Sequence, residues 1–71
     1  MKGKNIFTKV EVEKIKDLIK MKLDASPDKQ KGIRNKIRNI GFYYSDFSND
    51  KKGYTVTDFD NLIKSGSIKI I

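Results

Sequence analysis

The short turn Asp24-Ala25-Ser26 separates two segments that each carry the signals of a helix, and this arrangement constrains the fold more than any other feature of the sequence. In the first segment, Thr8 and Glu11 have the spacing of a capping box, in which both side chains accept hydrogen bonds from end amides of the helix. The apolar residues that follow keep the spacing of one helical stripe: Val12, Ile15, Leu18, Ile19 and Leu23. We therefore expect a helix over residues 9–24.

The second segment has its own start and stop signals. Ser26 suits the N-cap position, and Pro27 suits the first helical position, where its missing N–H group costs nothing. Gly41 is placed to end the helix in a left-handed conformation. A narrow apolar stripe runs between these signals: Ile33, Ile37 and Ile40. The sequence predicts a helix over residues 27–40, and because the turn before it is short, the two helices must be neighbours in space.

Beyond the second helix the pattern changes to that of short strands. The aromatic-rich segment 42–47 favours a strand, and segments 54–56 and 67–71 have the composition of two more. Acidic residues open a third, short helix over residues 58–65. The sequence thus predicts an α+β fold in which two N-terminal helices pack with a small antiparallel sheet and a third helix.

The length of the chain, 71 residues, allows one small domain. We expect this domain to cover residues 8–71 and residues 1–7 to form a flexible basic tail. No segment approaches the roughly 20 apolar residues that span a bilayer, so we expect no membrane insertion. The basic start is not followed by the apolar stretch of a secretory signal, and a cytoplasmic location is the default expectation.

Missing residue types exclude much chemistry. The chain has no Cys and no His, so it has no disulfide, Cys/His zinc site, thiolate nucleophile or imidazole base. Oxygen-bearing residues from Asp46 onward have the spacing of the start of a calcium loop, but Lys51 and Thr57 stand where such a loop needs Gly and Glu. We expect a non-enzymatic binding module with no metal and no cofactor.

The positive charge is unevenly distributed. The formal net charge is +7, and residues 1–40 carry all of it, because residues 41–71 contain four basic and four acidic side chains. Lys outnumbers Arg by 14 to 2, and a codon bias towards Lys, Ile and Asn would produce much of this excess. The position of the arginines is more informative, since both lie in the second predicted helix.

The second predicted helix carries the main candidate site. Four polar side chains share its solvent face: Lys31, Arg34, Asn35 and Arg38. Arg, Asn and Lys are the residues with which a helix contacts guanine, adenine and phosphates of DNA, and two helices joined by a short turn resemble a helix-turn-helix in general layout. Three lysines along one edge of the first helix would add phosphate contacts: Lys9, Lys16 and Lys20. The alternative interpretation is a solvated polar face.

The aromatic residues after Gly41 suggest two further hypotheses. Together with Lys51 and Lys52, the rings would form a platform on which single-stranded bases stack: Phe42, Tyr43, Tyr44, Phe47 and Tyr54. A domain this small needs most of these rings for its core. Rings left exposed, such as Tyr43 and Tyr54, would instead serve a protein–protein interface.

The basic charge also allows a separate hypothesis, attachment of the protein to an anionic membrane surface.

Segments 37–47 and 57–70 together resemble a pattern seen in short uncharacterised bacterial proteins. The resemblance covers about the last half of the chain. It implies a stand-alone domain and transfers no function to any residue.

Overall fold

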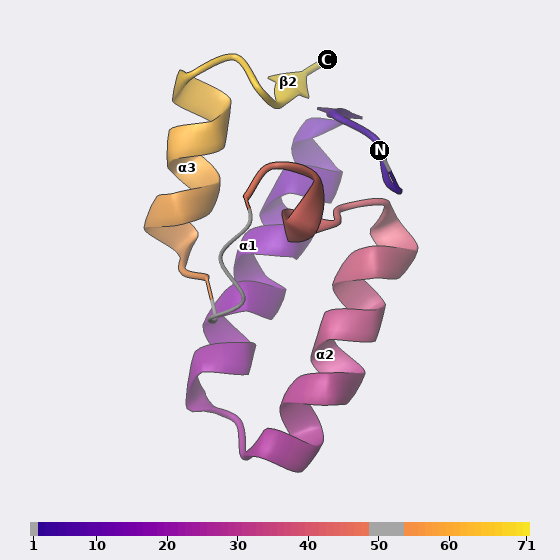
Figure 1. The fold of residues 1–71 in the computed structure, drawn as a ribbon, viewed down its shortest axis with the longest axis vertical. Coiled ribbons are helices and arrows are strands. Elements are labelled where there is room, and N and C mark those ends of the chain that lie inside the picture. Colours follow the sequence, from indigo (N-terminus) through magenta and orange to yellow (C-terminus); the bar gives the residue numbers. More distant parts are fainter. Residues whose placement is uncertain (1, 49–53) are drawn as a thin grey trace.

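Three helices make up most of the fold. The computed structural model describes residues 2–48 and 54–71. Its elements follow in the order β1 (Ile6–Phe7), α1 (Lys9–Asp24), α2 (Pro27–Ile40), the 3₁₀ turn η1 (Tyr44–Asp46), α3 (Val56–Lys64) and β2 (Lys69–Ile70) (Figure 1).

The first two helices confirm the boundaries that the sequence predicts. At the start of α1, Thr8 and Glu11 form both hydrogen bonds of the capping box. The helix α2 runs from Pro27 to Ile40 and is capped by Gly41, whose φ of 117° lies in the left-handed region. Ser26 occupies the N-cap position, although its side chain makes no capping hydrogen bond. Local signals therefore determine where both helices begin and end.

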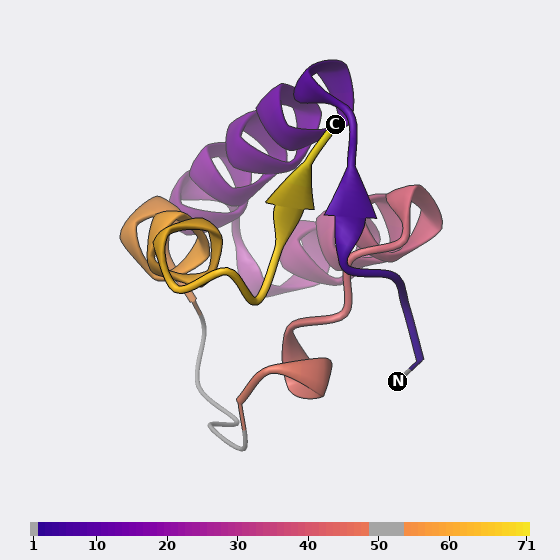
Figure 2. The same cartoon turned by 90° about the horizontal axis from the view of Figure 1, so that it is seen from above.

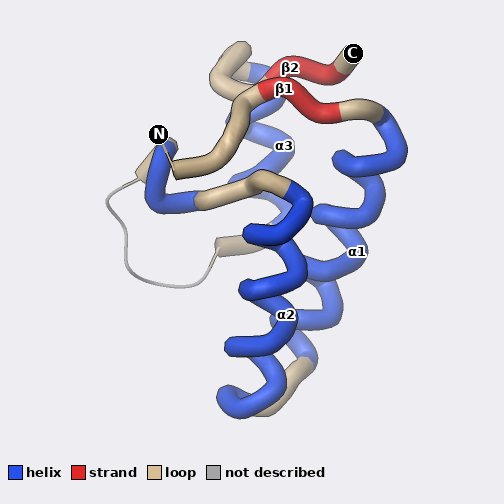
Figure 3. The backbone as a smooth tube through the Cα atoms, turned by 90° about the vertical axis from the view of Figure 1, so that its right-hand side faces the viewer, coloured by secondary structure: helices blue, strands red, loops and turns tan. Residues whose placement is uncertain are grey.

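The two long helices run antiparallel, side by side, as Figure 1 and Figure 3 show. The helices of a helix-turn-helix motif cross at about 90–120°. The pair α1–α2 is instead a helical hairpin, so the expected resemblance to a helix-turn-helix does not extend to the way the helices pack.

The predicted antiparallel sheet is wrong. The strands β1 and β2 form a two-stranded parallel sheet, with Ile6 opposite Lys69 and Phe7 opposite Ile70 (Figure 2). Within segment 42–47 the chain forms η1 rather than a strand. Alternate side chains of a strand point to opposite faces, which would place Phe47 on the other face from Phe42. The turn instead brings the rings of Tyr44 and Phe47 within 6.4 and 5.9 Å of the Phe42 ring, measured between centroids.

The third helix exists as predicted, but it begins earlier. The Thr55 side chain accepts a hydrogen bond from the Asp58 amide, and the Asp58 carboxylate accepts one from the Thr55 amide. This second capping box starts α3 at Val56, so segment 54–56 contributes a buried ring, a cap and a first helical residue rather than a strand.

The core begins before residue 8, where the sequence places the start of the domain. Phe7, in the predicted tail, is fully buried. The backbone amides of Lys2 and Gly3 each donate to the Asp46 carboxylate at 2.8 Å, and the Lys4 amide donates to the Gly41 carbonyl at 2.9 Å. Residues 2–7 therefore lie against the chain that follows α2.

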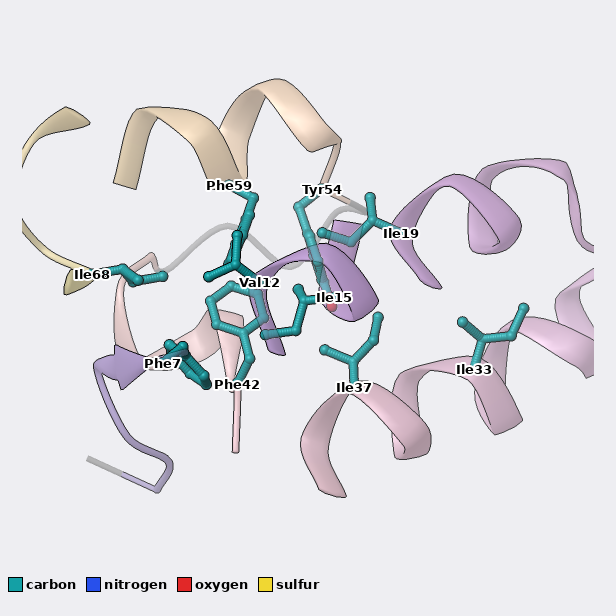
Figure 4. Packing of buried hydrophobic residues seen from close by; sticks show 10 residues of the cluster. All are labelled: Phe7, Val12, Ile15, Ile19, Ile33, Ile37, Phe42, Tyr54, Phe59 and Ile68. Atoms are coloured by element: carbon teal, nitrogen blue, oxygen red, sulfur yellow. The ribbon is translucent and has the colours of Figure 1, made fainter. Parts of the chain in front are cut away.

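Phe42 lies at the centre of the core (Figure 4). Its ring packs edge-to-face on Phe59 at 5.0 Å, on Tyr54 at 5.8 Å and on Phe7 at 6.3 Å, measured between centroids. The buried apolar residues come from every long element and from both ends of the chain: Phe7, Val12, Ile15, Ile19, Ile33, Ile37, Phe42, Tyr54, Phe59 and Ile68. One aromatic ring thus connects β1, α3 and the segments between α2 and α3.

The central position of Phe42 yields a stability prediction. Phe42→Ala should cost about 3–5 kcal/mol of unfolding free energy, which equals the whole stability expected of so small a domain, so the variant should be largely unfolded. Ile37→Val should cost about 0.5–1.5 kcal/mol and stay folded. Urea denaturation followed by circular dichroism measures both, with Ile71→Ala as an exposed control. A Phe42→Ala variant with a near-native urea midpoint contradicts this description of the core.

Candidate functional site

All four candidate residues on α2 are exposed: Lys31, Arg34, Asn35 and Arg38. The helix buries Ile33 and Ile37 against the core, which turns the opposite side of α2 to solvent. Lys31, Arg34 and Arg38 have the spacing i, i+3, i+7 and therefore lie along one stripe. The predicted cationic face of α2 is present.

The structure brings this stripe together with tyrosines from the chain that follows α2. The guanidinium carbon of Arg38 lies 5.8 Å from the centre of the Tyr43 ring, within cation–π range. The ring of Tyr44 stacks on that of Tyr54 at a centroid distance of 4.5 Å and an interplanar angle of 17°. We call Lys31, Arg34, Arg38, Tyr43 and Tyr44 the arginine–tyrosine surface.

Tyr54 is not an exposed interface residue, contrary to the expectation from the sequence. Its relative exposure is 8%, and its ring lies between the ring of Tyr44 and the ammonium group of Lys22. Burial raises the pKa of the Tyr54 phenol, and the nearby charges of Arg38 and Arg34 oppose this shift. Tyr54 therefore lies beneath the arginine–tyrosine surface and packs against Tyr44, while Tyr43 and Tyr44 remain partly exposed.

Lys22 is a residue of the site that sequence reasoning missed. Its side chain is buried, and its Nζ atom lies 4.0 Å from the centre of the Tyr54 ring. Burial lowers the pKa of the Lys22 ammonium group, and the charge of Arg34 adds to this effect. The helical spacing predicts Leu23 on the buried stripe, but Leu23 is 55% exposed. The three-residue spacing from Ile19 to Lys22 was the available signal, because a lysine can bury its aliphatic stem.

The three candidate lysines of α1 belong to a different surface: Lys9, Lys16 and Lys20. The Nζ atom of Lys16 lies 2.8 Å from Asp60 Oδ1 on α3. Lys9 and Lys20 share the stripe of Lys16 by helical spacing, and both are exposed. Since α3 and α2 flank opposite sides of α1 (Figure 1), this stripe does not adjoin the arginine–tyrosine surface.

Among the described residues, no carboxylate forms an ion pair with the arginine–tyrosine surface. Within residues 2–48 and 54–71 the ion pairs are Lys4–Glu11 and Lys16–Asp60, and neither includes Arg34 or Arg38. The carboxylate of Asp46, in η1, accepts its hydrogen bonds from the Lys2 and Gly3 amides. These hydrogen bonds hold the pKa of Asp46 below its ordinary value. Both arginines therefore remain available to an anionic ligand.

The structure does not describe every residue of the predicted stacking platform and of the calcium-type segment. Lys51 and Lys52, which the sequence places beside the rings, fall outside the described residues, as does much of the calcium-type segment. Among the residues that the structure describes, no three or more acidic side chains are grouped as a metal site. In the same part of the chain, each helix is too short or too polar to cross a membrane.

Comparison of the chain with protein-family models, with curated proteins and with solved structures finds no match.

The burial of Tyr54 predicts how its phenol titrates. An ultraviolet absorbance titration should show a phenol that ionises above the ordinary tyrosine range in the folded protein, and Tyr54→Phe should remove it. Because the folded state holds this proton more tightly, its contribution to stability is present below the ordinary tyrosine pKa and is lost as pH rises through the folded pKa. If Tyr54→Phe removes only a phenol of ordinary pKa, this description of the ring is wrong.

Proposed function

We propose that this protein is a non-enzymatic module that binds nucleic acid through the arginine–tyrosine surface. One observation carries the proposal: both arginines of the chain are exposed on one side of α2, next to tyrosines, and neither has a carboxylate partner among the described residues. We expect the module to act in the cytoplasm.

The chemistry of arginine supports a phosphate-bearing ligand. A guanidinium group offers five N–H donors in a planar fork that matches two oxygens of a phosphate, and it also stacks on aromatic planes. The contact of Arg38 with Tyr43 contributes about 0.5–1 kcal/mol to the fold at an exposed site, and the same two groups are those with which a single-stranded nucleic acid is bound. The net charge of +7 adds a long-range attraction to any polyanion.

The separate lysine stripe of α1 has a smaller role in this proposal. Lys16 is engaged by Asp60, and the stripe faces away from α2. A ligand held by Arg34 and Arg38 does not reach Lys9 or Lys20 directly. These lysines raise the local concentration of an anionic ligand, and removing them tests charge without removing contacts.

A protein–protein module that uses exposed aromatics is the alternative function. Its two candidate residues were Tyr43 and Tyr54, and the burial of Tyr54 leaves Tyr43 as the accessible one. A single half-buried ring beside two arginines is a small apolar surface, so the geometry supports nucleic acid better.

A binding titration tests the proposal. Fluorescence anisotropy with labelled single-stranded RNA, single-stranded DNA and duplex DNA should show binding of at least one of them that weakens steeply with salt. The double variant Arg34→Ala/Arg38→Ala should weaken that binding at least about tenfold and lower the slope of log K against log salt by roughly 1.4 to 1.8, the value for two lost phosphate contacts.

The matched control is Lys9→Ala/Lys20→Ala, which removes the same charge from exposed positions on α1. This control should weaken binding much less. Equal losses in the two double variants contradict the location of the site. Binding weaker than about 10⁻⁴ M near physiological salt for all three oligonucleotides contradicts the function itself.

A further inference from the structure

We infer that the ligand is a single-stranded nucleic acid rather than a duplex, and that the ring of Tyr43, with Arg38 beside it, holds one of its bases by stacking. This inference rests on the proposed function and specifies its ligand.

The shape of the chain around α2 disfavours a duplex. A helix that reads duplex DNA must enter a major groove about 12 Å wide, which requires open space on both flanks of the helix. Beside the exposed face of α2, η1 projects beyond the plane of the helical hairpin, as Figure 2 and Figure 3 show. The contact between Arg38 and Tyr43 places the arginine stripe beside this projecting segment. The cations therefore line a corner, which a flexible strand can follow and a rigid duplex cannot.

Gly41 creates this corner. Its left-handed φ of 117° ends α2, and the chain then turns so that Tyr43 returns towards Arg38 in the last turn of the helix. A Cβ atom at Gly41 would come closest to the flexible Lys4 side chain, so the left-handed φ is what favours glycine at this turn. The corner is thus a built feature of the backbone.

The ring of Tyr43 is held in position but is not used in the core. One edge lies against the backbone of Gly3, where a Cβ atom would come within 2.7 Å of Tyr43 Cδ1. Among the described residues, Tyr43 takes part in none of the ring–ring contacts of the Phe42 cluster, and its side chain is partly exposed. Because Arg38 lies over this ring, the part of the ring that stays exposed is the planar surface on which a nucleobase can stack.

The remaining cations lie where the backbone of such a strand would continue. From Lys31 to Arg38 the stripe extends about 10 Å along α2, at 1.5 Å per residue. A strand with a base at Tyr43 therefore meets Arg34 and then Lys31 along its phosphates. Stacking contacts of this kind tolerate any base, because every base has a π face, so we expect weak sequence preference.

The test compares one labelled 12-nucleotide DNA strand, the same strand annealed to its complement, and the RNA strand of the same sequence. The single strands should bind the protein more tightly than the duplex. Tyr43→Ala should weaken single-strand binding about five- to a hundredfold, the range that corresponds to one lost base stack, and should change duplex binding much less. Tyr43→Phe keeps the ring and should bind as the wild type does. Tyr43→Leu fills the space beside Gly3 without a planar surface and should behave as Tyr43→Ala, which covers the case in which alanine disturbs the fold.

The outcomes separate this inference from the proposed function. If the duplex binds as tightly as the single strands, or if Tyr43→Leu and Tyr43→Phe bind alike, the single-strand inference is overturned while the nucleic-acid function stands. If none of the three oligonucleotides binds, both fail. A large difference between DNA and RNA strands that both need Tyr43 supports the inference and identifies the sugar that the surface prefers.

Discussion

The edge-to-face packing of aromatic rings on Phe42 is the interaction on which the rest of the structure depends. This ring contacts Phe7 before α1, Tyr54 and Phe59 at the start of α3, and Tyr44 in the turn after α2. Such pairs contribute about 0.5–1.5 kcal/mol each beyond the burial of their area. The two-residue strands β1 and β2 join the two ends of the sequence, and the ring contacts of Phe42 hold β1, the turn after α2 and α3 together. At the surface, Tyr44 is held in place by its contacts with the buried rings of Phe42 and Tyr54.

The candidate site is a direct consequence of this core. Tyr54 packs on Phe42, Tyr44 stacks on Tyr54, and Lys22 covers the other side of Tyr54. A lysine with a lowered pKa beside exposed arginines costs free energy, since burial and like charge both disfavour its ammonium form. The fold keeps these positive charges on one side of the hairpin, and a polyanionic ligand would relieve their repulsion. We therefore regard the tyrosines and the cations as one surface.

Local signals made the helices predictable, and long-range packing made the rest unpredictable. Capping at Thr8 and the glycine stop at Gly41 act within a few residues, so both helix boundaries followed from the sequence. The sheet pairs Phe7 with Ile70, a contact that no local pattern specifies. The aromatic run after Gly41 has the composition of a strand. The strand propensity of aromatic residues, however, reflects how well their side chains pack and become buried, and it does not fix the backbone conformation. Likewise, the lysines of α1 shared a helix face in the sequence, while only the position of α3 showed that this face turns away from the arginines.

The central claim is that one surface, formed by the second half of α2 and the turn after it, binds a single strand. An NMR titration of the ¹⁵N-labelled protein with an unlabelled single-stranded oligonucleotide tests it most directly. The account predicts that the largest amide shifts fall between Arg34 and Tyr44, with small changes at Lys9, Lys16 and Lys20. Largest shifts on the α1 lysine stripe, or shifts spread evenly over the whole chain, would contradict it.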